Sequence, residues 1–184
     1  MTLFEYVGIA FSLVFGFAAM RLVSGLPHAI DRERRYWVHL SFVAVQLLVT
    51  AGVFWAFWSF RDIDWTFPNF VLALANPSLL YFGACTLVPE AASSVESWHA
   101  YYYSIRRKYF VGILLWATVV ALAGTFVLDR SLTHPTRIFQ AIVVVVGVLG
   151  ASTSSTRVHA GIAAFSISLV AVAAFVVFAA PMDR

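Results

Sequence analysis

Six long apolar stretches constrain this sequence more than any other feature. A helix that crosses a bilayer needs roughly 20 consecutive, mostly apolar residues. Stretches of about this length recur along the chain, and a proline or charged residues border nearly every one. The expected spans are residues 3–26, 37–60, 67–88, 109–128, 135–152 and 158–180. The pattern predicts an all-α integral membrane bundle of six transmembrane helices, which forms a single domain over residues 1–184.

The composition excludes most classes of soluble protein. Hydrophobic residues make up 61% of the chain and charged residues only 11%, against roughly 25% charged residues in an ordinary soluble domain. A soluble monomer of this composition would expose far more apolar surface than such proteins tolerate. We therefore exclude a soluble enzyme, a disordered chain and a nucleic-acid partner. The single cysteine, Cys85, excludes a disulfide scaffold and dithiol exchange, both of which need a pair.

Lysine and arginine are distributed unequally between the two sides of the predicted bundle. Eight lie in or beside the first, third and fifth connections: Arg21, Arg32, Arg34, Arg35, Arg106, Arg107, Lys108 and Arg157. Four lie on the opposite side: Arg61, Arg130, Arg137 and Arg184. Because cytoplasmic loops carry the excess of basic residues, we expect a multi-pass protein of the inner or plasma membrane with both termini outside. We also expect the basic clusters to contact anionic lipid headgroups of the bilayer.

The segment before the fourth span has its own helical signals. Ser93 and Glu96 have the spacing of a capping box, in which each side chain binds a free backbone N–H of a new helix. Trp98 and the tyrosines at 101–103 follow, and such rings favour the depth of the lipid headgroups. The segment predicts a short interfacial helix, which either lies near the membrane surface or runs straight into the fourth span.

Polar residues near the middle of two spans suggest a path for a solute. Pro77 follows Asn76 in the third span, removes one helical hydrogen bond and crowds the carbonyl of Ala73, so it predicts a kink. We expect Asn76 or Gln46 to satisfy that carbonyl, because lipid offers no donor. A broken helix near the midplane marks the binding site in many transporters. The candidate pathway residues are Gln46, Thr50, Asn76 and Pro77, although an internally satisfied kink explains the same pattern.

A second group of polar residues maps to the predicted cytoplasmic rim. This rim cluster consists of His39, Glu90, Glu96, His99 and His159. Glu96 and His99 are three residues apart, which places them on one helical face with the spacing found in di-iron carboxylate bundles. They are therefore candidate ligands for a divalent metal or an acid–base site. A di-metal bundle normally has two such motifs, whereas this chain has one. The alternative is that interfacial histidines and capping carboxylates bind backbone, lipid or water.

Small residues in the first span predict a contact surface. Gly8, Ser12 and Gly16 are spaced by four residues, which places them on one helical face and lets a second helix approach closely. The contact could lie within the bundle or between subunits.

Three functions fit these observations. The first is a small-solute or ion transporter or channel-like protein, oligomeric because six helices with so little internal polarity make a poor monomeric pore. The second is a non-catalytic membrane partner or assembly factor, which binds a second copy or another membrane protein through the face of Gly8, Ser12 and Gly16. The third is a membrane-embedded enzyme with a metal or acid–base site at the cytoplasmic rim.

Overall fold

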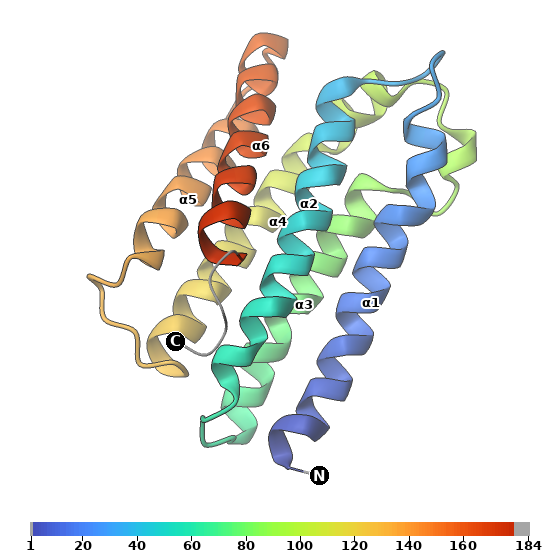
Figure 1. Ribbon diagram of the computed structural model, residues 1–184. Coiled ribbons are helices and arrows are strands. Elements are labelled where there is room, and N and C mark those ends of the chain that lie inside the picture. The colour runs from blue at the N-terminus through green and yellow to red at the C-terminus, as the bar shows by residue number, and fades with distance from the viewer. Residues whose placement is uncertain (1, 179–184) are drawn as a thin grey trace.

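The computed structural model describes residues 2–178, and this range contains helices and connections but no strand (Figure 1). The α-helices are α1 (Leu3–Ala29), α2 (Trp37–Ala56), α3 (Phe67–Leu87), α4 (Trp98–Phe126), α5 (Thr136–Ser152) and α6 (Thr156–Phe178). Two short 3₁₀ helices, η1 (Phe57–Phe60) and η2 (Ala92–Ser94), follow α2 and α3. The all-α prediction is confirmed for the described residues.

Five helices are long and apolar enough to cross a membrane: α1, α2 with η1, α3, α4 and α6. The sixth, α5, is apolar but has only 17 residues, or about 25 Å at 1.5 Å per residue, against a hydrocarbon core of roughly 30 Å. These helices are compatible with a multi-pass membrane protein, while the sixth crossing stays a prediction. The first helix continues through Pro27 to Ala29 rather than ending at residue 26. The last two residues of the expected sixth span, 179–180, lie outside the described residues.

A separate interfacial helix before α4 is not confirmed, because only the three-residue 3₁₀ helix η2 lies between α3 and α4. Instead α4 begins at Trp98 and runs unbroken to Phe126, which is the second of the two expected arrangements. The hydroxyl of Ser97 caps its N-terminus by accepting the Ala100 N–H at 3.3 Å. The predicted capping box of Ser93 and Glu96 is therefore wrong, because both residues precede the cap and Ser93 lies in the 3₁₀ turn η2.

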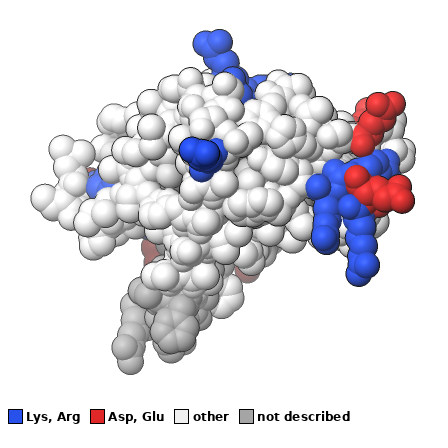
Figure 2. All heavy atoms as spheres, turned by 90° about the horizontal axis from the view of Figure 1, so that it is seen from above, with Lys and Arg blue, Asp and Glu red and all other residues white. Residues whose placement is uncertain are grey.

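Successive helices run in opposite directions, so the connections gather at two ends (Figure 1). We call the end with connections 30–36, 88–97 and 153–155 the basic end, and the end with 61–66 and 127–135 the far end. Figure 2 looks down on the basic end, where blue and red side chains gather at one edge and most of the surface is uncharged. Helices α1 and α4 both pack on α3, and α2 packs on α1 and α3. Helix α5 packs mainly on α4, and α6 mainly on α2. Few contacts join α5 to α6.

Two glycines bring α5 very close to α4. A Cβ atom added to Gly150 would lie 2.5 Å from the ring of Phe110, and one added to Gly147 would lie 2.7 Å from Leu114 Cδ2. Gly25 plays the same role between α1 and the end of α3, where it meets Val88. Close helix packing within the chain therefore depends on these positions.

Candidate functional site

Aromatic and histidine side chains fill the interior of the basic end. The ring of Tyr102 stacks on Phe42 with a centroid distance of 5.7 Å, and its hydroxyl lies 2.7 Å from Nδ1 of His159. Nε2 of His159 lies 3.0 Å from the carbonyl oxygen of Thr153. Since a carbonyl can only accept, Nε2 carries the proton and Nδ1 accepts from Tyr102. His159 is fully buried, so this arrangement joins α4 to the start of α6 inside the bundle.

His39 is the second histidine buried at the basic end. Its Nε2 donates to the carbonyl of Leu87 at 3.0 Å, and its ring stacks on Trp98 at 4.5 Å. Nδ1 has no hydrogen-bond partner in the described part of the chain. The indole of Trp98 in turn donates to the carbonyl of His28 at 2.8 Å. These contacts join the start of α2 to the ends of α1 and α3 and the start of α4.

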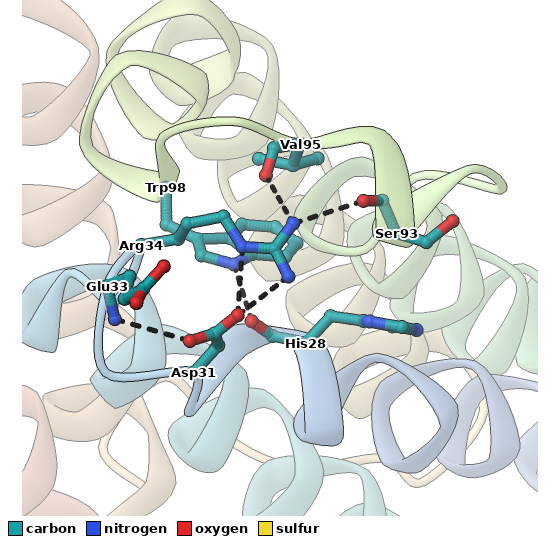
Figure 3. A network of polar contacts seen from close by, with 7 residues as sticks. All are labelled: His28, Asp31, Glu33, Arg34, Ser93, Val95 and Trp98. Carbon is teal, nitrogen blue, oxygen red and sulfur yellow. Dashed lines mark hydrogen bonds and ion pairs between the residues drawn. The ribbon is translucent and has the colours of Figure 1, made fainter.

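The guanidinium of Arg34 ties the two long connections of the basic end together (Figure 3). Its Nε and Nη2 donate to the carboxylate of Asp31 at 3.0 and 2.7 Å. Its Nη1 donates to the carbonyls of Ser93 and Val95 at 3.1 and 3.2 Å. The hydrogen bonds from Arg34 hold the pKa of Asp31 below its ordinary value. The buried side chains therefore pack the inside of the basic end, and this ion pair joins connections 30–36 and 88–97.

The structure does not gather the predicted rim cluster into one site. His39 and His159 are buried and bind separate partners, whereas Glu90, Glu96 and His99 are exposed. The prediction that Glu96 and His99 share a helical face is wrong, because Glu96 precedes the first turn of α4. Among residues 2–178, no three His, Cys, Asp or Glu side chains gather as a metal site would require. The predicted divalent metal thus finds no support in this part of the chain.

A cleft lies between α2, α4, α5 and α6, in the part of the bundle nearer the far end. It consists of three adjoining cavities of about 70, 150 and 170 Å³, which share Trp116 and Phe139 in their walls. The innermost cavity borders Gln46 and Ser166, and the outermost borders Asn76 and Arg130. The space exists because α5 packs along α4 and α6 packs along α2, while α5 and α6 make few contacts with each other. We call this space the cleft.

Two of the four predicted pathway residues border the cleft. Gln46 lies at its inner end, where its Nε2 donates to the carbonyl of Leu80 at 3.2 Å and its Oε1 accepts the hydroxyl of Tyr109 at 3.1 Å. Asn76 lies near its outer end, where its Oδ1 accepts the indole N–H of Trp116 at 2.7 Å. Gln46 therefore binds the carbonyl of Leu80 and not that of Ala73, so this part of the expectation for the Pro77 kink is wrong.

The other two predicted pathway residues lie elsewhere. Pro77 is buried within α3. The hydroxyl of Thr50 donates to the carbonyl of Gln46 at 2.7 Å, and Thr50 borders a different hollow, between α1 and α2. Neither side chain is part of the cleft wall.

The hollow between α1 and α2 measures about 240 Å³ and is also lined by Ser12 and Gly16. A Cβ atom added to Gly16 would meet no atom within 4 Å, and one added to Gly8 would lie 3.6 Å from the ring of Phe57, an ordinary contact. Ser12 is exposed and its hydroxyl donates to the carbonyl of Gly8. The predicted small-residue face is therefore not used for close helix packing within this chain.

Several residues of the cleft were not predicted as site residues. Ser166 and Tyr109 border its inner end, and Arg130 and Gln140 its outer end. The available signal was the pair Arg130 and Arg137, two arginines in a short segment on the side that carries few basic residues.

Comparison with known proteins adds no relative: no protein-family model, curated protein or solved structure matches this chain. The geometry of the chain is therefore the basis for any functional conclusion.

Proposed function

We propose that this chain is a small membrane transport protein whose solute enters the cleft between α2, α4, α5 and α6. One observation carries the proposal, namely the contrast between the two ends of the bundle. The outermost cavity of the cleft borders Arg130 and Gln140 at the far end, whereas Phe42 and Phe110 border its inner end and pack with Tyr102 and His159 toward the basic end. A cavity closed at one end is the arrangement that an alternating-access transporter adopts in one of its states.

The depth of the cleft supports this proposal. Gln46 is nine residues into α2, which corresponds to about 14 Å along the helix axis, close to half of a hydrocarbon core of roughly 30 Å. The inner end of the cleft would then lie near the middle of the membrane. Gln46, Tyr109 and Ser166 supply polar groups at this depth, where transporters commonly bind their substrates.

For a solute to pass from the cleft to the basic end, side chains between α4 and α6 must move. The inner end of the cleft is separated from the basic end by Phe110, whose ring packs against both Phe42 and His159. Opening a path would require α6 to move from α4, with loss of the hydrogen bond between Tyr102 and His159. Because that bond links side chains of two helices with few other mutual contacts, it is the contact that we expect to change between the two states.

Labelling of a cysteine tests this proposal. In a Cys85→Ala background, Ser166→Cys places a thiol at the inner end of the cleft, and a membrane-impermeant thiol reagent is added to either face of sealed vesicles. Ser168→Cys is the matched control, because Ser168 is exposed on the outside of α6 two residues away. We expect the thiol at position 166 to react from both faces and the thiol at position 168 to be protected by lipid.

Two results would contradict the proposal. If the thiol at position 166 reacted from neither face, the cleft would not be accessible to water. If it reacted only from the face of the far end under every condition, the cleft would be a binding site without transport.

A second candidate function is supported by the face of Ser12 and Gly16. These residues border an open hollow and take no part in close packing within the chain. A second copy of the chain or another membrane protein could insert an apolar side chain there. Gly16→Leu would fill the hollow, so loss of a co-purifying chain in this variant supports the partner function, and an unchanged composition contradicts it.

A further inference from the structure

Two arginines, Arg130 and Arg137, lie at the outer end of the cleft and differ in the hydrogen bonds that their guanidinium groups make. Arg137, at the start of α5, is fully occupied by oxygen acceptors. Its Nη1 donates to the carbonyl of Ala121 and to Oε1 of Gln140 at 3.1 and 3.0 Å. Its Nη2 donates to the hydroxyl of Thr125 and the carbonyl of Arg130 at 2.7 and 3.0 Å. These neutral oxygens accept the hydrogen bonds of the Arg137 guanidinium, so Arg137 does not require a bound ligand as an acceptor.

Arg130 has no such partners. Its side chain borders the cleft and is partly buried, and its guanidinium makes no hydrogen bond or ion pair within residues 2–178. Burial, together with the positive charge of Arg137, lowers the pKa of Arg130. A bound anion would stabilise a partly desolvated cation that lies near a second cation.

Two side-chain amides at this end of the cleft, Gln140 and Asn76, also present donors. The Oε1 of Gln140 is occupied by Arg137 and the Oδ1 of Asn76 by Trp116. These bonds leave the amide nitrogens of Gln140 and Asn76, which can only donate, without a partner in the described chain. A site with three donor groups and a positive charge is complementary to a carboxylate or phosphate.

The rest of the cleft wall is apolar. Beyond Arg130 it is formed mainly by aliphatic and aromatic side chains, including Val49, Val53, Phe139 and Val170. The wall follows α5 from Thr136 to Val146, ten residues or about 15 Å. This length equals one leaflet of a hydrocarbon core of roughly 30 Å. A chain held here would have the depth that an acyl chain has in the surrounding membrane.

We propose that the cleft binds a single-chain anionic amphiphile, with its carboxylate or phosphate on Arg130, Gln140 and Asn76 and its hydrocarbon chain between α2, α4, α5 and α6. This inference rests on the proposed transport function and names the class of its substrate. Charge complementarity favours this occupant over a neutral lipid, and the apolar length of the cleft favours it over a free inorganic anion.

Tryptophan quenching provides the test. A fatty acid brominated along its chain is added to the purified protein in neutral detergent, and the fluorescence of Trp116, which lies in the cleft wall, is followed. We expect saturable quenching that Trp116→Phe removes. Arg130→Gln should weaken binding roughly ten- to a hundredfold, the value of a hydrogen-bonded charge, and Arg130→Lys should restore part of it. Arg61→Gln is the matched control, because it removes a positive charge from the same end away from the cleft and should leave binding unchanged.

The methyl ester of the same brominated acid and inorganic phosphate complete the experiment. We expect the ester to bind the unaltered protein as weakly as the acid binds the Arg130→Gln variant, and phosphate to compete poorly. The proposal would be overturned if the unaltered protein bound the acid and the ester equally well. It would also be overturned if the Arg130→Gln variant bound the acid as tightly as the unaltered protein does. Strong competition by phosphate alone would identify a small-anion site instead. If the acid fails to bind while the thiol at position 166 still reacts from both faces, only the substrate class is wrong and the transport proposal stands.

Discussion

The close contact between α4 and α5 allows a sharp test of the packing, through the substitution Gly150→Ala. A Cβ atom at this position would lie 2.5 Å from three ring atoms of Phe110, whereas carbon atoms in contact are normally about 3.5–4.0 Å apart. The ring or the helix must therefore move by about 1 Å. The ring has little room, because Phe110 is 1% exposed and packs against Phe42, Tyr109 and His159.

The matched control is Gly161→Ala on α6. A Cβ atom there meets nothing within 4 Å, so this substitution changes only the helix propensity. Gly→Ala in a helix gains roughly 0.5–1 kcal/mol, and overpacking of a tight interior costs about 1–3 kcal/mol. Because the propensity gain is common to both variants, the difference between their free energies of unfolding isolates the overpacking. We expect Gly150→Ala to be less stable than Gly161→Ala by about 1–3 kcal/mol.

Unfolding in mixed micelles with increasing denaturing detergent, followed by near-UV circular dichroism, measures this difference. Equal stability of the two variants would refute the reasoning, since it would mean that α4 and α5 are not in close contact at Gly150.

Two further predictions concern the basic end. Tyr102→Phe removes the donor to Nδ1 of buried His159 and should cost about 1–3 kcal/mol of unfolding free energy. The same unfolding experiment in mixed micelles measures this loss of stability. Unchanged stability would show that the hydrogen bond between Tyr102 and His159 does not join α4 to α6. The pKa of Asp31 is lower in the folded chain than its ordinary value of 3.8, so its pairing with Arg34 contributes stability above that value and is lost as the pH falls through the folded pKa. Hydrogen exchange of the Trp98 amide, which donates to the carbonyl of Arg34, should therefore accelerate in acid relative to its intrinsic rate, while Asp31→Asn should lack this acid-dependent step. A protection factor independent of pH in the unaltered protein would contradict the role of the ion pair.

The helices themselves could be predicted from the sequence because stretches of roughly 20 mostly apolar residues, bordered by proline or charged residues, favour long apolar helices. The expected bounds of α3 and α5 differ from the observed ones by a single residue. The fourth span was expected at 109–128, eleven residues after the observed start of α4 at Trp98, although a helix running straight into that span was one of the two expected arrangements. Its first turns carry Tyr, His and Arg, which lower the hydrophobicity although the helix is continuous.

The rotation of each helix could not be predicted in the same way. In lipid both faces of a helix are apolar, so the periodicity that reveals the buried face of a soluble helix is weak. The sequence therefore does not distinguish His39, which is buried, from His99, which is exposed, although both lie at the basic end. It equally does not separate Gly150, which is packed against Phe110, from Gly16, which meets no neighbour.

The role of Arg130 depends on contacts that no spacing rule contains. Arg130 and Arg137 are equivalent as topology signals. The guanidinium of Arg137 nevertheless donates to carbonyl, hydroxyl and amide oxygens, whereas that of Arg130 has no acceptor among residues 2–178. This difference arises from the fold of the connection between α4 and α5, where the carbonyl of Arg130 itself accepts from Arg137.

The cleft requires that α5 cross the membrane, because α5 forms one of its walls and is the shortest α-helix among residues 2–178. Reporters fused to the two ends of the chain, read by their accessibility on each face of intact cells, test it directly. Six crossings place both reporters in the same compartment. Reporters in opposite compartments would mean an odd number of crossings and would contradict both the bundle and the cleft within it.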